Sequence, residues 1–172
     1  MEKGCIQIYH GNGKGKTTAA VGLLLRAAGQ GFSAGFAQFL KDGSSGECRM
    51  LADLPGVTLF PFLPKVPFTF AMTPEQRADA AAFYAALLDE IRQRRDLDLV
   101  VLDEVLDAVN AGILPETALL DFLKNRPAGQ EVVLTGRDPS ETLCRMADYI
   151  TDMRAAKHPY AAGQEARRGV EW

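Results

Sequence analysis

The sequence predicts an α/β fold: a doubly wound, mostly parallel sheet of five or six strands flanked by helices, in a single domain over residues 1–172. Short apolar runs typical of buried strands alternate with helix-like segments along the chain. A glycine-rich turn joins the first apolar run to the first helix-like segment, and a later apolar run ends in two acidic residues. In a parallel sheet both features open at the carboxyl edge, where ligands bind.

The elements are expected in a regular order. Buried strands are predicted over residues 6–9, 34–40, 57–62, 97–104, 131–135 and 149–153. Helices are predicted over 19–28, 47–54, 73–95, 115–124 and 138–147, the last begun by a cap at Asp138. The helix at Thr73 has the clearest start, because Pro74 follows the cap and Gln76 completes a capping box. A polar loop over 41–46 follows the second strand.

Composition excludes several classes of protein. The chain is 47% hydrophobic and 24% charged with a formal net charge of −3, which argues against a general nucleic-acid surface. Its three widely spaced cysteines favour a reducing, cytoplasmic environment over a disulfide or zinc framework. We expect no membrane span, since no apolar run approaches ~20 residues, and no signal peptide before the first strand.

A phosphate-binding loop is predicted between the first strand and the first helix. Its glycines allow a tight turn that points backbone N–H groups inward, and the helix N-terminus adds partial positive charge. Lys16 is expected to neutralise phosphate oxygens, and the Thr17 hydroxyl to bind Mg²⁺. The predicted nucleotide-binding residues are Gly11, Asn12, Gly13, Lys14, Gly15, Lys16, Thr17 and Thr18.

The spacing of this loop is unusual. The common pattern places a glycine at the position of His10, whereas counting from Gly11 leaves a spacer of three residues before Gly15-Lys16-Thr17. The alternative is a ligand-free turn, but two lysines and two threonines are hard to explain by turn chemistry. We interpret the segment as a compact variant of the phosphate loop.

Asp103 and Glu104 end the fourth predicted strand. An acidic strand end after a phosphate loop is typical of the P-loop (RecA-like) fold, in which a carboxylate binds Mg²⁺. Asp107, one helical turn further on, could join them. The structural alternative is that the two acids begin a solvated loop.

Two further segments have open interpretations. Phe68 and Phe70 follow prolines and are expected on a constrained loop, where they either fill the core or serve a site. The tail from Arg154 loses periodicity and is expected to fold over a ligand or a neighbouring subunit. His158 in that tail is more typical of a bystander than of a catalyst.

The residues alone leave the reaction open. Phosphoryl transfer by a small-molecule kinase, ATP-driven switching of a partner without catalysis, and attack elsewhere on the nucleotide all remain possible. The two histidines, His10 and His158, stand in unrelated contexts, so general acid–base chemistry is poorly supplied. This favours a nucleophile that needs no enzymic base.

The chain resembles the P-loop ATP:corrinoid adenosyltransferases (cob(I)yrinic acid a,c-diamide or cob(I)alamin adenosyltransferases) over nearly its whole length. The resemblance rests on the phosphate loop with its short spacer and on six shorter stretches. These stretches are Phe39-Leu40-Lys41, Phe68-Thr69-Phe70, Val100-Val101-Leu102-Asp103-Glu104, Leu134-Thr135-Gly136-Arg137, Met153-Arg154, and the tail with Lys157-His158-Pro159-Tyr160, Gly163, Ala166 and Gly169-Val170-Glu171-Trp172.

The resemblance implies a mechanism for adenosylcobalamin biosynthesis or salvage. Mg-ATP would lie on the loop in a reversed orientation, and Co(I) of a corrinoid would attack the ribose C5′ and release triphosphate. Lys14, Lys16 and a Mg²⁺ held by Thr17 and Glu104 would stabilise the leaving group.

Phe68 and Phe70 match the family's aromatic pair, which excludes the lower axial ligand of the corrinoid so that Co(II) becomes reducible to Co(I). Phe70 stands where a tryptophan is expected. The resemblance also implies a homodimer and a flavoprotein reductase as electron donor. The N-terminal extension that helps cover the corrinoid in longer members is expected to be absent.

Overall fold

The computed structural model describes residues 3–64 and 67–171 and contains one six-stranded sheet in the order β3-β2-β4-β5-β1-β6. All five strand pairings are parallel. The strands are β1 (Ile6–His10), β2 (Ala34–Gln38), β3 (Val57–Leu59), β4 (Leu99–Asp103), β5 (Glu131–Thr135) and β6 (Tyr149–Asp152). The predicted doubly wound parallel sheet is therefore confirmed.

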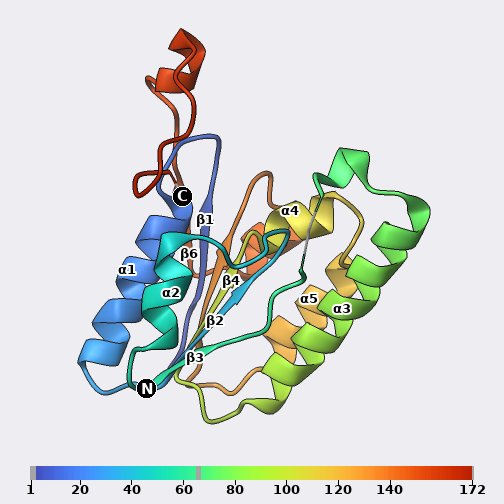
Figure 1. Ribbon diagram of the computed structural model, residues 1–172. Helices are drawn as coiled ribbons and strands as arrows, with labels where there is room; N and C mark the ends of the chain where they lie inside the picture. The colour runs from blue at the N-terminus through green and yellow to red at the C-terminus, as the bar shows by residue number, and fades with distance from the viewer. Residues whose placement is uncertain (1–2, 65–66, 172) are drawn as a thin grey trace.

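Helices cover both faces of this sheet (Figure 1). On one face lie α1 (Lys16–Gly29) and α2 (Gly46–Ala52). On the other lie α3 (Pro74–Gln93), α4 (Val105–Asn110) and α5 (Glu116–Asn125). The short α6 (Glu141–Met146) and the 3₁₀ turns η1 (Thr69–Ala71) and η2 (Pro159–Ala162) complete the described elements.

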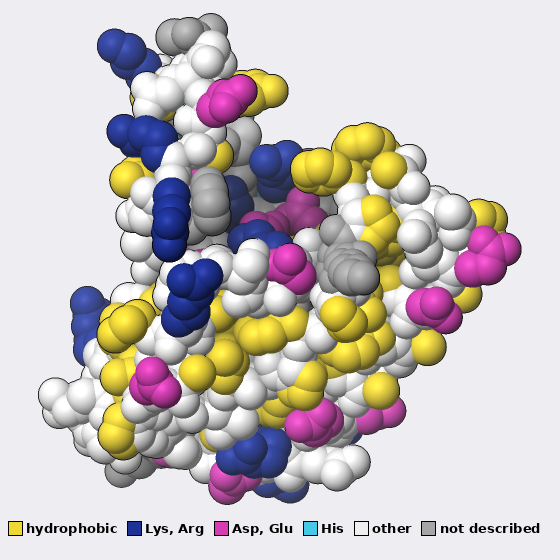
Figure 2. All heavy atoms as spheres, viewed as in Figure 1, with side chains coloured by type: hydrophobic (Ala, Val, Ile, Leu, Met, Phe, Trp, Pro, Cys, Tyr) yellow, Lys and Arg dark blue, Asp and Glu magenta, His cyan; other side chains and the backbone are white. Residues whose placement is uncertain are grey.

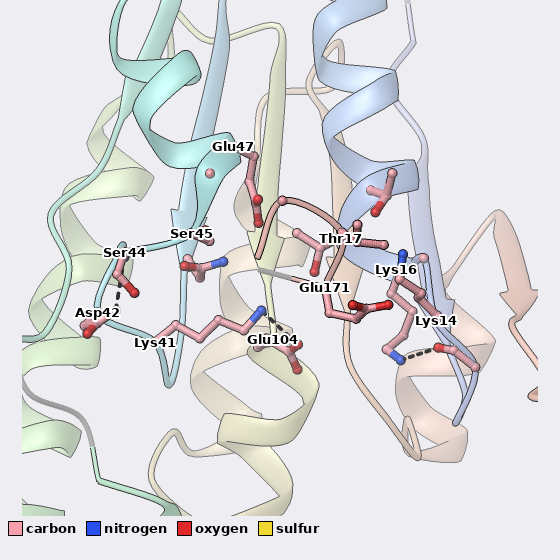
Figure 3. A pocket seen from close by; sticks show the side chains of 17 residues that line it. Lys14, Lys16, Thr17, Lys41, Asp42, Ser44, Ser45, Glu47, Glu104 and Glu171 are labelled. Carbon is pink, nitrogen blue, oxygen red and sulfur yellow. Dashed lines mark hydrogen bonds and ion pairs between the residues drawn. The ribbon is translucent and has the colours of Figure 1, made fainter. Parts of the chain in front are cut away.

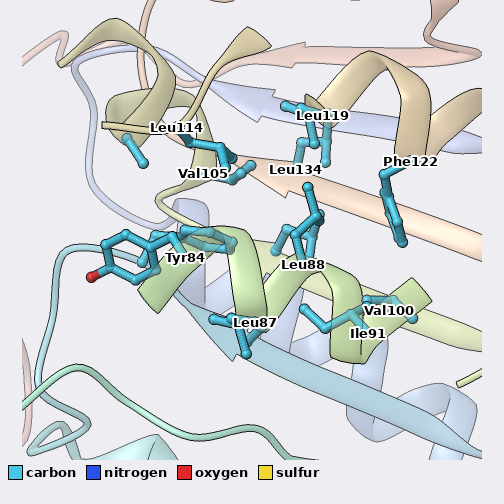
Figure 4. Close-up of a cluster of buried hydrophobic side chains, with 14 of the residues drawn as sticks. Tyr84, Leu87, Leu88, Ile91, Val100, Val105, Leu114, Leu119, Phe122 and Leu134 are labelled. Carbon is cyan, nitrogen blue, oxygen red and sulfur yellow. The ribbon is translucent and has the colours of Figure 1, made fainter. Parts of the chain in front are cut away.

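The strand period of two divides the core between the two faces. Along β4, Val100 and Leu102 belong to the larger apolar cluster with α3 and α5, whereas Leu99 and Val101 belong to the cluster with α1 and α2. Figure 4 shows the larger cluster, to which Tyr84 and Leu88 of α3 and Phe122 of α5 contribute side chains. Because both faces of β4 are buried, the strand reads as a continuous apolar run.

Several element ends differ from the sequence prediction. The first helix begins at Lys16 rather than Ala19, because Gly15 at φ 111° ends the loop and the next residues enter the first turn. The second strand ends at Gln38, since Leu40 has φ 55° and leaves the sheet. The third strand stops at Leu59, three residues early.

The helix ends also include one correction. Ser140, not Asp138, caps α6, since its hydroxyl accepts a hydrogen bond from the Leu143 amide. The capping box at Thr73 and Gln76 is present as predicted. Within residues 3–64 and 67–171, no helix combines the length and the apolar character that crossing a membrane requires.

Candidate functional site

The phosphate loop lies between β1 and α1, and the Lys16 ammonium lies inside its curve. Lys16 Nζ donates to the carbonyl oxygens of Gly11 at 2.8 Å and Gly13 at 3.0 Å. Gly11 and Gly15 have φ of 109° and 111°, in the region that glycine tolerates without strain. The loop therefore holds its own lysine in position at the N-terminus of α1.

The root of the C-terminal segment packs directly against this loop. The Gly13 amide donates to the Met153 carbonyl at 2.6 Å, and the Ala155 amide donates to Asn12 Oδ1 at 3.0 Å. A Cβ atom on Gly11 or Gly13 would lie 2.5 or 2.6 Å from the Met153 oxygen. These glycines are thus required by close packing of the chain on itself as well as by the turn.

Asp103 at the end of β4 is completely buried and accepts hydrogen bonds from three neighbouring elements. Its Oδ1 accepts from Thr17 Oγ1 at 2.8 Å and from Thr135 Oγ1 at 2.7 Å, and its Oδ2 from Gln38 Nε2 at 2.9 Å. Gln38 and Thr135 end the strands on either side of β4. These two residues could not be predicted from the sequence, because only the strand order makes them neighbours of Asp103.

Glu104 turns away from β4 at φ 59° and faces Lys41 from the loop after β2. Lys41 Nζ lies 3.4 Å from Glu104 Oε1 and 3.7 Å from Asp103 Oδ2. Burial alone would lower the pKa of Lys41, but the two carboxylates outweigh it and raise that pKa. Burial raises the pKa of Glu104, against the attraction of the Lys41 ammonium.

A cavity of about 710 Å³ opens beside the loop, as Figure 3 shows. It is lined by Gly13 to Thr18, by Glu104 and Lys41, and by the loop that leads into α2. Gly169, Val170 and Glu171 of the C-terminal segment also line it. The predicted loop residues and Glu104 thus share one cavity, except for Gly11 and Asn12, which are not among its lining residues. The tail reaches the same cavity.

Phe68 and Phe70 lie outside this cavity and are largely exposed, at 77% and 87% of their surface. Their rings stack with centroids 5.4 Å apart and an angle of 9° between planes. The interpretation that they fill the core is therefore wrong. Arg77 of α3 anchors their segment, because its guanidinium donates to Thr69 O at 3.2 Å and also to Ala111 O.

The segment that carries the two aromatic rings and the C-terminal segment that packs on the phosphate loop lie on two sides of one hollow. In Figure 1 the C-terminal segment and η1 rise on opposite sides of the carboxyl edge of the sheet. Figure 2 shows the hollow between them, with basic and acidic side chains at its base and hydrophobic side chains along one rim. An extended ligand could contact the charged base and the hydrophobic rim of this hollow together.

Oxygen donors suited to Mg²⁺ converge beside the loop. They are the Thr17 hydroxyl and the carboxylates of Asp103 and Glu104, the hard ligands that this ion prefers. Among the described residues no group of three His, Cys, Asp or Glu side chains could hold a metal ion by itself. This donor set fits an ion that takes its remaining ligands from nucleotide phosphates.

Two remaining polar candidates have other hydrogen-bond partners, and one of them also contacts Glu104. His158 Nδ1 accepts a hydrogen bond from the Tyr160 amide at the start of η2. Asp107 Oδ2 accepts from the Arg137 amide at 3.0 Å, and the Asp107 carboxylate also interacts with that of Glu104 and raises its pKa. Neither side chain lines the cavity beside the phosphate loop.

Comparison with solved structures supports the fold. The KaiC-like protein PH0186 from Pyrococcus horikoshii superimposes with a TM-score of 0.53 at 15% identity, over 86% of this chain and 71% of that one. At this level of identity the likeness concerns the fold alone.

Comparison with known sequences gives the family. The model of ATP:corrinoid adenosyltransferase BtuR/CobO/CobP matches residues 2–172. Corrinoid adenosyltransferase CobA of Salmonella typhimurium is 36% identical over 173 residues, which cover 99% of this chain and 87% of that protein. The corrinoid adenosyltransferase of Pseudomonas aeruginosa is 36% identical over 176 residues, covering 99% and 85%. The chain therefore belongs to the ATP:corrinoid adenosyltransferase family.

Proposed function

We propose that this protein transfers the 5′-deoxyadenosyl group of ATP to the Co(I) centre of a corrinoid and releases triphosphate. One observation carries the proposal beyond family membership. The cavity of about 710 Å³ lies at the phosphate loop, and the segment with a stacked, exposed aromatic pair rises on the other side of the hollow at the carboxyl edge of the sheet. Nucleotide and a large flat acceptor could therefore be bound facing each other.

The triphosphate of ATP would bind to the residues from Gly11 to Thr18. Lys14 and Lys16 would neutralise its oxygens, and Thr17, Asp103 and Glu104 would hold Mg²⁺ beside it. Adding Asp103 to the predicted pair of Thr17 and Glu104 is supported by its hydrogen bond to Thr17 at 2.8 Å. When bound, Mg²⁺ supplies charge neutralisation to the departing triphosphate.

The proposed reaction needs little proton transfer by the protein. An electron pair of Co(I) forms the bond to C5′, and the C5′–O bond breaks so that its pair leaves with triphosphate. No proton has to be removed from the nucleophile. The protein's task is then to position both reactants and to stabilise the leaving anion.

Phe68 and Phe70 would contact the lower face of the corrin. Two exposed apolar rings, stacked at 9° between planes, offer a surface that cannot ligate cobalt. Displacing the lower axial ligand would leave four-coordinate Co(II), which is easier to reduce. We infer that this pair prepares the acceptor, while the loop prepares the nucleotide.

The setting of the enzyme is also part of the proposal. We infer one domain over residues 1–172, a homodimer, and electrons supplied by a flavoprotein reductase. A cytoplasmic location is supported by the three free thiols, Cys5, Cys48 and Cys144.

A single assay tests this function. Purified protein, MgATP and a corrinoid reduced chemically to Co(I) are mixed, and both the visible spectrum and the phosphate products are recorded. A light-sensitive Co–C spectrum with release of triphosphate is expected. ADP with an unchanged corrin spectrum would instead indicate a small-molecule kinase. If neither product forms, the remaining interpretation is a non-catalytic ATP-dependent switch.

A further inference from the structure

Lys41 is the cation that contacts both carboxylates at the end of β4. Its Nζ lies 3.4 Å from Glu104 Oε1 and 3.7 Å from Asp103 Oδ2. In Figure 3 its side chain extends from the loop after β2 across the cavity to Glu104. The Asp103 side chain has no exposed surface and that of Glu104 only 22%. The ammonium thus stands on the open side of an otherwise enclosed acidic pair.

The other sides of Asp103 are already occupied. Its Oδ1 accepts from Thr17 and Thr135, and its Oδ2 from Gln38, at distances between 2.7 and 2.9 Å. A second cation that binds both Asp103 and Glu104 must therefore approach from the side that Lys41 holds. An ammonium and a divalent cation bound to the same two carboxylates would lie close together, and they would repel each other strongly because little water screens their charges. Lys41 and a divalent ion cannot share this position.

The two acids alone offer a metal few protein ligands. Described His, Cys, Asp and Glu side chains form no group of three that could bind one. Mg²⁺ in such sites takes phosphate oxygens as further ligands. The ammonium has an alternative partner in the same cavity, because Lys41 lines it together with the phosphate loop.

We propose that Lys41 holds the metal position between Asp103 and Glu104 until a divalent cation arrives with ATP, and that its ammonium then moves to the triphosphate. Lys41 is in this view a positioning residue that couples metal entry to nucleotide entry. The protein does not load the metal ahead of its substrate, and the displaced charge joins Lys14 and Lys16 at the leaving group. This inference rests on the proposed use of Mg-ATP.

Mn²⁺ binding to the full chain without nucleotide tests the inference. Mn²⁺ prefers the same oxygen ligands as Mg²⁺, and the free ion is counted by its electron paramagnetic resonance signal. Lys41→Met removes the charge and keeps most of the stem. Lys41→Arg keeps the charge. Lys124→Met is the matched control, since it changes the net charge equally at an exposed position on α5.

Without nucleotide, Lys41→Met is expected to bind Mn²⁺ at least about tenfold more tightly than the wild type. Lys41→Arg and Lys124→Met should match the wild type. Equal Mn²⁺ affinity of Lys41→Met and wild type would overturn the inference, and so would equal tightening in Lys124→Met.

A second measurement separates this failure from failure of the proposed function. Wild-type protein with ATP should bind Mn²⁺ in a ternary complex, seen as a further loss of the free-ion signal beyond that of ATP alone. Its absence would overturn both the metal assignment and the inference. Its presence, with no effect of Lys41→Met, would overturn the inference alone.

Discussion

The Thr17 hydroxyl donates a 2.8 Å hydrogen bond to Oδ1 of Asp103, 86 positions further along the chain. The bond joins the first turn of α1 to the end of β4. Thr135 at the end of β5 donates to the same oxygen at 2.7 Å. Buried side chains therefore fix the phosphate loop relative to two strand ends, and this link belongs to the fold as well as to the site.

Asp103→Ala is expected to destabilise the protein as well as the site. Three donors, Thr17, Thr135 and Gln38, would lose their acceptor in a buried region. We expect a loss of about 2–4 kcal/mol in the free energy of unfolding, measured in urea. Asp53→Ala, at an exposed position after α2, should cost less than about 0.5 kcal/mol. Similar costs for the two variants would contradict this role of Asp103.

Lys16→Ala is expected to weaken ATP binding at least about 100-fold, because a charge-assisted contact to phosphate is lost. Its ammonium also bonds the carbonyls of Gly11 and Gly13, so the loop would lose internal support as well. Isothermal titration calorimetry measures the affinity. Lys124→Ala on the exposed side of α5 serves as the charge control. Retention of wild-type affinity in Lys16→Ala would place the triphosphate elsewhere.

Glu104→Gln is expected to raise thermal stability while it impairs metal-dependent ATP binding. Burial raises the pKa of Glu104; the Lys41 ammonium opposes this, and the Asp107 carboxylate adds to it. A carboxyl whose pKa is higher in the folded than in the unfolded chain stabilises the fold at pH values below its ordinary, unfolded-state pKa. This contribution is lost as pH rises through the raised value. The variant should therefore melt higher than the wild type at neutral pH.

Thermal melts across pH check the sign of this effect. The advantage of Glu104→Gln should shrink as pH is lowered to about 4, where the wild-type carboxyl also becomes neutral. A variant that melts below the wild type at neutral pH, with a difference independent of pH, would contradict the assignment. Reduced Mn²⁺ binding in the presence of ATP would report the separate loss of a metal ligand.

Local patterns were sufficient to predict the fold class and the two segments that meet at the candidate site. The glycine-rich loop after β1 and the acidic end of β4 are each contiguous in sequence, and their chemistry follows from neighbouring residues. What local patterns could not supply was the sheet order. Gln38 and Thr135 meet Asp103 only because β2 and β5 flank β4.

Backbone conformations at the strand ends were equally hidden. Leu40 and Glu104 both have positive φ, at 55° and 59°, which ends two strands early and turns Glu104 toward Lys41. No propensity of leucine or glutamate predicts this conformation. The helix α4 that follows Glu104 was missed for the same reason. Exposure of Phe68 and Phe70 also depended on tertiary packing, since apolar residues after prolines suit a core equally well.

Phe70→Ala is expected to change catalysis without changing stability. The ring is 87% exposed, so truncation should alter the free energy of unfolding by less than about 0.5 kcal/mol. If the ring displaces the lower ligand of the corrinoid, the rate with enzymically reduced Co(II) should fall at least about tenfold. The rate with chemically prereduced Co(I) should change much less.

Phe32→Ala is the control for this variant, because Phe32 is another phenylalanine at the surface, 36% exposed, and is not among the cavity lining residues. It should leave the ratio of the two rates unchanged. Equal losses from both cobalt states in Phe70→Ala would remove the assignment of Phe70 to ligand displacement.

Arg77→Ala is expected to disturb the aromatic pair from a distance. The Arg77 guanidinium, on the first turns of α3, ties Thr69 O in η1 to Ala111 O at the end of α4. Without it the segment that carries Phe68 and Phe70 should be less ordered, and hydrogen exchange over residues 68–72 should be faster. The rate with Co(II) should fall about threefold to tenfold, in the same direction as for Phe70→Ala but less.

ATP affinity is expected to stay within about twofold of the wild type, since Arg77 does not line the cavity beside the phosphate loop. Arg77→Lys should give an intermediate result, because a single ammonium lacks the planar fork that reaches two carbonyls. Arg145→Ala removes an exposed guanidinium of α6 and should change neither measurement. Faster exchange in Arg77→Ala with an unchanged ratio of Co(II) to Co(I) rates would show that order in this segment does not govern the reduction step.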